Sequence, residues 1–243
     1  MRVRAVLFDL GDTLVDTKDF DGWAELARRF YLDLDPDVLL HSYFEVENAV
    51  DERPHPEGRE AALVDFWQKT LSSAAAKPVD GETTRKFIAA TREVERPVHL
   101  YSDVRRCLDT LRSERRELGV VSNSTSEASV RRILDRAGIL EYFSRILSSG
   151  TEGVEKPDPA IFRRAVERMN VRPEETVYVG NLAFTDAKAA GAAGLHGVWL
   201  NREGCGYGED PPEIISLLEL PLVVHRLENG ITTPRGPTAG GAR

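Results

Sequence analysis

The chain has 243 residues, of which 41% are apolar, and this length and composition are typical of a folded protein with a packed interior. Its formal net charge of −8, with dispersed lysines and arginines, argues against nucleic acid and membrane surfaces as partners. Only Cys107 and Cys205 are present, without the paired spacing of a zinc site or a disulfide framework, so we expect a reducing, cytoplasmic location.

The first predicted element is a strand at the start of VLFDLGDTLVDT, residues 6–17. Its apolar run ends at Asp9, and Gly11, Asp12 and Thr13 follow directly. An ordinary polar turn uses the same residue types. These residues alone therefore leave open whether Asp9 is a turn residue or a functional group beyond the sheet.

A long insertion follows this strand. Roughly ninety residues separate it from a helix predicted near residue 104, whereas a crossover between parallel strands needs only a few dozen. The intervening segments have apolar residues at helical spacing, with turn signals between them. We expect a small helical bundle, about residues 16–98, to be inserted into a core formed by residues 1–15 and 99–229.

From residue 99 onward, helical and strand-like segments alternate, which predicts a parallel sheet covered by helices. The predicted strands are residues 118–121, 145–147, 176–179 and 197–200, with a further edge strand at 222–224. Four helices are predicted. One starts at residue 104, a second ends at Gly138, a third starts at Pro159 after an Asp158 N-cap, and a fourth covers residues 186–193. The tail, residues 230–243, has no apolar period and is predicted to be disordered.

Polar residues follow the predicted strands at the edge where ligands bind in open parallel sheets. Asp9 follows the first strand, Ser122 the second, Lys156 comes after the third, and Asn181 and Asp186 follow the fourth. Each residue alone has a simpler explanation, since Ser122 and Asp186 suit helix caps and Lys156 suits a solvated surface. Together they predict one crevice that holds carboxylates, a hydroxyl and an ammonium group.

Four segments resemble, in order, the motifs of the haloacid dehalogenase superfamily. They are FDLGDTL (8–14), GVVSN (119–123), EKPDPAIF (155–162) and GNLAFTD (180–186). Most members of this superfamily are phosphatases, with a Rossmann-like core and a mobile cap. The resemblance spans residues 4 to 200 and implies an α/β fold, in which helices flank a parallel sheet and an all-helical cap is inserted after the first motif.

The resemblance also implies a Mg²⁺-dependent phosphatase that acts on a small phosphorylated metabolite. Asp9 would be the nucleophile and would form an aspartyl-phosphate. The implied Mg²⁺ ligands are Asp9, the backbone carbonyl of Gly11, Asp186 and the amide oxygen of Asn181.

The phosphoryl group would be held by a second set of residues. Lys156 is implied as a catalytic point charge, and Thr13, Ser122 and Asn123 are the further substrate contacts. Neither the substrate nor the oligomeric state is indicated by any residue.

Two positions depart from the family pattern. Gly11 stands where phosphatases have the general acid and base, a group typically worth ~10² to 10⁴ in rate, so a weakened or substrate-restricted enzyme is expected. A leaving group of low pKa, such as an acyl or aryl phosphate, would need the missing acid least. Asp12 is the candidate substitute acid, and Asn181 replaces an aspartate, which removes one charge from the metal site.

Two alternatives remain open. One is a catalytically inactive module that binds a phosphorylated ligand or a partner protein, motivated by Gly11 and Asn181. The other is a metal-independent 2-haloacid dehalogenase, in which Asp9 attacks carbon. Against the second, those relatives usually have an aromatic residue at the position of Gly11 and a closer spacing than that of Asn181 and Asp186.

Overall fold

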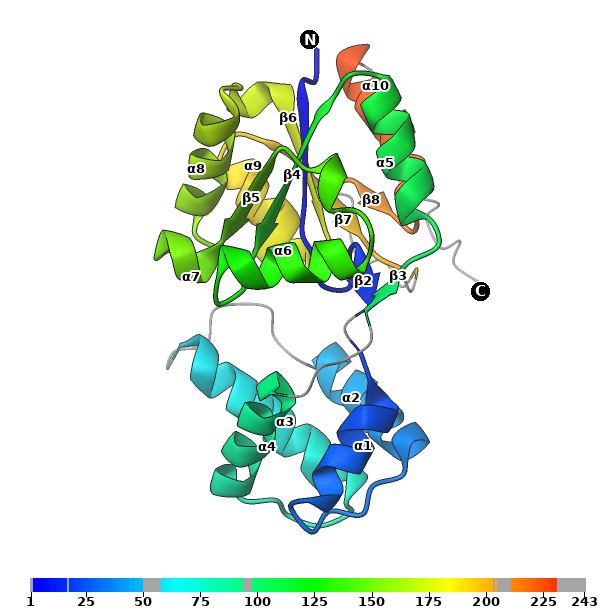
Figure 1. The fold of residues 1–243 in the computed structure, drawn as a ribbon, viewed down its shortest axis with the longest axis vertical. Coiled ribbons are helices and arrows are strands. Elements are labelled where there is room, and N and C mark those ends of the chain that lie inside the picture. Colours follow the sequence, from blue (N-terminus) through cyan, green and yellow to red (C-terminus); the bar gives the residue numbers. More distant parts are fainter. Residues whose placement is uncertain are drawn as a thin grey trace, which may run out of the picture. The chain divides into compact units, whose positions relative to one another are not determined.

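The computed structural model describes residues 2–16, 18–49, 58–93, 98–202, 204 and 211–230 (Figure 1). It divides into two compact units, Met1–Thr17 with Val98–Arg243 and Lys18–Pro97. The predicted tail lies outside the described residues from residue 231 onward. Within the described ranges, no helix is both long enough and apolar enough to cross a membrane.

The first unit is built on a six-stranded sheet in which all neighbouring strands are parallel, as predicted. The strands are ordered β5-β4-β1-β6-β7-β8. Their bounds are β1 Ala5–Phe8, β4 Glu117–Ser122, β5 Arg145–Ser148, β6 Thr176–Gly180, β7 His196–Leu200 and β8 Glu213–Ile214. Since Phe8 pairs with Val120 of β4 and with Val179 of β6, the chain leaves β1 between the ends of these two strands.

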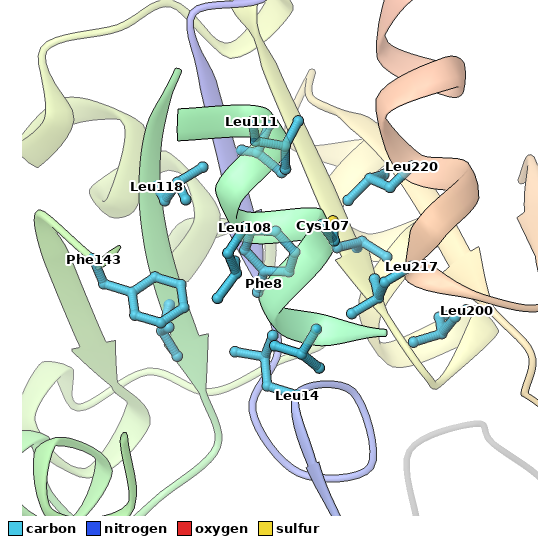
Figure 2. Close-up of a cluster of buried hydrophobic side chains, with 14 of the residues drawn as sticks. Phe8, Leu14, Cys107, Leu108, Leu111, Leu118, Phe143, Leu200, Leu217 and Leu220 are labelled. Carbon is cyan, nitrogen blue, oxygen red and sulfur yellow. The ribbon is translucent and has the colours of Figure 1, made fainter. Parts of the chain in front are cut away.

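Both faces of the sheet are covered. Val6 and Phe8 of β1 belong to a core with α5 (Val104–Ser113), α6 (Glu127–Arg136) and α10 (Leu220–Glu228), as Figure 2 shows for Phe8. Ala5 and Leu7 point to the opposite face of the sheet and belong to a second core, which includes residues of α8 (Pro159–Met169) and α9 (Ala189–Ala192). A strand that is buried on both faces is apolar throughout, which is why residues 5–8 show no polar alternation.

The end of the core differs from the prediction at two places. The edge strand predicted at residues 222–224 is wrong, because this segment lies in helix α10. Ser216 and Glu219 form a capping box at the preceding 3₁₀ turn η4 (Leu217–Glu219), and Leu220, Val223 and Val224 are buried at helical spacing. The edge of the sheet is instead the two-residue strand β8.

The helix predicted over residues 186–193 also begins earlier. It starts as a π-helical turn, η3 (Ala183–Lys188), and continues as α9. A π-turn widens the backbone locally and is found frequently at functional sites. The predicted start of α8 is confirmed, since the Asp158 side chain accepts a hydrogen bond from the Ala160 N–H.

Short elements complete this unit. They are β2 (Val15–Asp16), β3 (His99–Leu100), η1 (Leu140–Tyr142), α7 (Ser149–Glu152) and η2 (Pro173–Glu175). Strands β2 and β3 pair antiparallel, with Val15 opposite Leu100. The chain therefore leaves the first unit and returns to it through one paired stem.

The second unit is helical in its described residues. It contains α1 (Phe20–Arg28), α2 (Pro36–Ala49), α3 (Arg59–Ala74) and α4 (Gly81–Glu93). Its core is rich in aromatic side chains, of which Trp23 and Trp67 meet edge to face at 4.9 Å between ring centroids. These large side chains give the unit a hydrophobic core of its own.

Candidate active site

Asp9 lies at the carboxyl end of β1 and is only 7% exposed. Its backbone N–H donates to the carbonyl of Val179, which continues the sheet pairing one residue beyond the strand. The following loop turns back on itself, since the N–H of Leu14 donates to the carbonyl of Leu10 at 2.9 Å. This turn brings the Thr13 hydroxyl to 3.2 Å from Asp9 Oδ2, to which it donates.

Lys156 forms ion pairs with two carboxylates, those of Asp9 and Asp186. Its Nζ lies 2.6 Å from Asp9 Oδ1 and 2.7 Å from Asp186 Oδ1, and the residue is 5% exposed. The backbone of Lys156 is held by Asn123, whose amide donates to the Lys156 carbonyl and accepts from the Lys156 N–H, both at 2.9 Å. Residues far apart in the sequence therefore form one buried charged cluster.

Asp186 is almost fully buried, at 1% exposed, and folds back against the end of β6. Its Oδ2 accepts from the N–H of Leu182 at 3.1 Å. A Cβ on Gly180 would lie 2.4 Å from the Asp186 carboxyl carbon, so only glycine fits here. The glycine at the start of the GNLAFTD segment is thus required by the approach of this carboxylate.

The cluster carries two carboxylates and one ammonium group away from water. Burial raises the pKa of Asp9 to about 6, with Lys156 opposing the shift and the charge of Asp186 adding to it. Burial alone would lower the pKa of Lys156, but Asp186 and Asp9 outweigh it and raise that pKa. Lys156 therefore stays charged, and the cluster has one formal negative charge that no cation in it balances.

Tyr178 also belongs to the cluster, although sequence reasoning assigned it only to a strand. Its hydroxyl accepts from Lys156 Nζ at 2.9 Å and donates to Asp186 Oδ1 at 3.0 Å. Tyr178 is fully buried in β6, where a phenolic hydroxyl needs a partner. A lone tyrosine within the apolar strand TVYVG was the available signal.

Replacing Tyr178 by phenylalanine is expected to lower the free energy of unfolding by about 1–2 kcal/mol, because Lys156 and Asp186 each lose a buried partner. Chemical denaturation measures this change. Tyr142→Phe is the matched control, because the Tyr142 hydroxyl bonds Asp109 at an exposed position and its loss is expected to cost at most about 0.5 kcal/mol. Equal losses in the two variants would contradict the buried role of Tyr178.

The other residues that the sequence predicted for the site differ in the contacts that they make. Ser122 ends β4, is 8% exposed, and its hydroxyl makes no hydrogen bond within the described ranges. The Asn181 Oδ1 lies 3.5 Å from the Thr13 hydroxyl. The amide of Asn123 is occupied by the backbone of Lys156, and its contact with substrate stays a prediction.

Asp12 takes a left-handed backbone conformation, with φ of 58°. Aspartate tolerates this conformation better than most residues. Burial raises the pKa of Tyr101, and the charge of Asp12 adds to this rise. The pKa of Asp9, in contrast, is shifted by burial and by the charges of Lys156 and Asp186. A role of Asp12 as substitute acid stays a prediction.

The oxygen atoms of Asp9, Asp186 and Asn181 are candidate ligands for a metal ion. No group of three or more His, Cys, Asp or Glu side chains suited to a metal occurs among the residues that the structure describes. Asp9 and Asp186 nevertheless approach the same ammonium group and offer hard oxygen donors beside the amide oxygen of Asn181. Oxygen donors and an unbalanced negative charge fit Mg²⁺, which commonly uses one or two protein carboxylates.

Comparison with known proteins agrees with this arrangement. The family model of the haloacid dehalogenase-like hydrolases matches residues 3–194. The chain belongs to this family. It is therefore a hydrolase, and its match extends over the Asp9, Lys156 and Asp186 segments of the cluster.

Individual relatives include phosphatases and dehalogenases. The glyceraldehyde 3-phosphate phosphatase of Methanothermobacter thermautotrophicus is 29% identical over 83% of this chain and 87% of its own length. The (S)-2-haloacid dehalogenase 2 of Pseudomonas sp. is 34% identical over 51% of this chain and 56% of its own. The solved 2-haloacid dehalogenase of Pseudomonas syringae pv. tomato DC3000 is 29% identical, with a TM-score of 0.59 over 92% of this chain and 99% of that one.

Proposed function

We propose that this hydrolase of the haloacid dehalogenase-like family is a Mg²⁺-dependent phosphatase that acts on a small phosphorylated metabolite. The observation that carries the proposal is the Lys156 ammonium held 2.6 Å from Asp9 and 2.7 Å from Asp186 at the ligand-binding edge of the sheet. A phosphatase relative aligned over most of both chains supports the same chemistry. The Asp9 carboxylate is the proposed nucleophile.

In the first step, one Asp9 oxygen forms a bond to phosphorus while the bond from phosphorus to the leaving-group oxygen breaks. The leaving group departs with the electron pair. Lys156 would hold the phosphoryl group by charge, and the Ser122 hydroxyl, which makes no hydrogen bond within the described ranges, is the proposed donor to a phosphate oxygen. Thr13 keeps Asp9 Oδ2 oriented through its 3.2 Å hydrogen bond.

In the second step, water attacks the phosphorus of the aspartyl-phosphate, the bond to Asp9 breaks with its electron pair left on the carboxylate, a water proton passes to solvent, and inorganic phosphate leaves. Bound Mg²⁺ would balance the negative charges of Asp9 and the phosphate as they approach. Asp9, Asp186, Asn181 and the carbonyl of Gly11 are the proposed ligands. Lys156, with its raised pKa, remains a charge partner and not a proton donor.

Gly11 has no group that can protonate the leaving oxygen or activate the water. We therefore propose that the enzyme favours phosphates with good leaving groups, such as acyl and aryl phosphates. Alkyl phosphates, the class to which glyceraldehyde 3-phosphate belongs, have poor leaving groups and are expected to be turned over more slowly. The enzyme would thus differ in preference from its phosphatase relatives.

Turnover of acyl, aryl and alkyl phosphates with and without Mg²⁺ tests the proposed function. We expect Mg²⁺-dependent release of phosphate, with a rate that rises steeply as the pKa of the leaving group falls. The Gly11→Asp variant restores an acid and is expected to raise alkyl-phosphate turnover by about 10-fold or more, while it changes aryl-phosphate turnover much less. No phosphate release from any class would refute the proposed function.

The Asp12→Asn variant tests whether Asp12 acts as the general acid that is missing at Gly11. Since we propose that the site works without a general acid, we expect turnover to change by less than about 3-fold, whereas an acid role of Asp12 would be worth ~10² or more. Asparagine also tolerates the left-handed conformation of this position, so the loop is expected to keep its shape. A loss of 100-fold, confined to alkyl phosphates, would instead identify Asp12 as the acid.

Dehalogenation is a second candidate, favoured by the haloacid dehalogenase relatives and by the absence of an acid at Gly11. In that reaction Asp9 would attack carbon and displace halide, and the ester would be hydrolysed without a metal. Halide release from 2-haloacids in the presence of a chelator would favour this candidate. Release of phosphate from phosphate esters only when Mg²⁺ is present would favour the phosphatase.

A further inference from the structure

Two backbone carbonyls of the active-site loops accept hydrogen bonds from side chains at the end of β7. The indole Nε1 of Trp199 donates to the carbonyl of Asn181 at 3.0 Å. The guanidinium of Arg202, two residues beyond β7, donates to the carbonyl of Thr13 at 2.7 Å. Neither Trp199 nor Arg202 was among the residues that the sequence predicted for the site.

The two loops held in this way also touch each other. The Thr13 hydroxyl lies 3.2 Å from Asp9 Oδ2 and 3.5 Å from Asn181 Oδ1. A shift of either loop would therefore change the position of the nucleophile relative to the proposed metal ligand Asn181. The side chains of Trp199 and Arg202 fix the backbone on both sides of this contact.

Arg202 is itself held on several sides. Its two terminal nitrogens lie 2.9 and 3.2 Å from the two oxygens of Asp103, and its guanidinium lies 3.9 Å from the ring centroid of Tyr101. Asp103 also accepts from the Ser216 hydroxyl and the Leu217 N–H, both at 2.9 Å. A lysine could not make the paired contact and reach Thr13 at once, since only the guanidinium has a planar fork of donors.

The charge state of Asp103 supports this arrangement. Burial alone would raise the pKa of Asp103, but the hydrogen bonds from Arg202, Leu217 and Ser216 outweigh it and lower that pKa. Asp103 is therefore ionised at neutral pH, and the Arg202 side chain stays anchored. The anchor links the nucleophile loop to the start of α5 and to η4.

We propose that Arg202 and Trp199 are positioning residues, which hold the loops of Thr13 and Asn181 at the spacing that catalysis by Asp9 requires. The kinetic part of this inference rests on the proposed phosphatase function. Misplacing a reacting group by about 1 Å can cost ~10² in rate. Loss of the Arg202 contact is thus expected to affect turnover far more than substrate affinity.

The kinetic test compares Arg202→Gln with Arg116→Gln, using p-nitrophenyl phosphate and Mg²⁺. Arg116 is a matched control because its guanidinium is buried, pairs with Glu228 and donates to the carbonyl of Val3, far from Asp9 in the sheet. We expect kcat of Arg202→Gln to fall by about 10- to 100-fold with KM changed less than about 3-fold. Arg116→Gln is expected to lower stability at least as much while kcat stays within about 2-fold.

Chemical rescue distinguishes positioning from a general loss of stability. Arg202 lines an open pocket of about 480 Å³ together with Tyr101 and Asp103, so a guanidinium ion can enter. Millimolar guanidinium is expected to restore part of kcat in Arg202→Ala and none in Arg116→Ala. Trp199→Phe, which keeps the ring and loses the donor, is expected to lower kcat by about 3- to 10-fold.

Hydrogen exchange of residues 9–16 tests the loop without any turnover. The amides of Asp12, Leu14 and Val15 are hydrogen-bonded within this loop, and we expect them to exchange faster in Arg202→Gln but not in Arg116→Gln. Unchanged kcat and unchanged exchange in Arg202→Gln would overturn the inference. If the parent protein released no phosphate, the proposed function would fail, and exchange alone would decide the role of Arg202.

Discussion

Replacing Asp9 by asparagine is expected to abolish phosphate-ester hydrolysis and to make the protein more stable. The nucleophilic oxygen is lost, so turnover should fall by on the order of 10⁴-fold or more. The fold should gain on the order of 3 kcal/mol at neutral pH, because the substitution removes a carboxylate whose ionisation burial disfavours. Lys156 keeps Asp186 as its partner.

The gain in stability has a defined pH dependence in metal-free protein. The pKa of Asp9 rises from 3.8 to about 6 on folding, so below pH 3.8 the carboxyl is neutral in both states and the variant has no advantage. Between these values only the unfolded chain ionises, and the parent loses stability as the pH rises. The advantage of Asp9→Asn should therefore grow from pH 4 to 6 and then stay constant.

Denaturant unfolding across this pH range, together with phosphate release, checks the prediction. Asp135→Asn, at an exposed carboxylate of α6, is the control and should change neither quantity. Parent-like turnover in Asp9→Asn would remove Asp9 from the mechanism. A loss of stability at neutral pH would show that the ionised form of Asp9 is favoured by the fold.

Replacing Lys156 by methionine is expected to have the largest effect on stability. Asp9 and Asp186 would remain buried without the ammonium group that lies within 2.7 Å of both. Breaking a buried ion pair on one side typically costs 3–5 kcal/mol, so we expect a loss of about this size. Turnover should fall by about 10³-fold or more because the phosphoryl group loses its charge partner.

Added Mg²⁺ makes this prediction specific. A divalent cation between the two carboxylates would replace part of the lost charge, so Mg²⁺ should stabilise Lys156→Met more than the parent. Thermal unfolding with and without Mg²⁺ measures the difference. Lys86→Met removes an exposed ammonium paired with Glu82 and is the control, with no measurable change in stability expected.

A conservative variant covers the case in which Lys156→Met does not fold. Lys156→Arg keeps the positive charge, so the fold is expected to persist, but the planar guanidinium cannot occupy the same point between Asp9 and Asp186. Turnover should still fall by about 10-fold or more. Parent-like activity in Lys156→Arg would show that the position of the charge is unimportant.

Much of the site could be read from the sequence for one physical reason. The carboxyl ends of neighbouring parallel strands meet at one edge, so residues that follow the strands are brought together whatever their separation along the chain. Asp9, Lys156 and Asp186 were predicted in this way, and they meet in one buried cluster. The apolar run at the start of residues 6–17 likewise indicated a strand, which the structure shows to be buried on both faces.

Side-chain partners inside the fold could not be read in this way. The run TVYVG predicts a buried strand whichever way the Tyr178 hydroxyl points, and only the packed sheet brings that hydroxyl to Lys156 and Asp186. Residues 222–224 are apolar and include the β-branched Val223 and Val224, yet the capping box of Ser216 and Glu219 and the burial of Leu220 and Val224 make this segment a helix. Local propensity is a weak preference that tertiary packing overrides.

The sequence by itself determined the α/β class, the parallel sheet and the charged residues that follow its strands. These follow from local patterns and from the rule that parallel strands present their carboxyl ends together. Only the tertiary structure decided the Tyr178 contact and the hydrogen bond from Arg202 to Thr13, and the burial of Leu220 and Val224 favoured helix over strand in α10. Each of these depends on contacts between distant segments, whose free energies no local window of sequence contains.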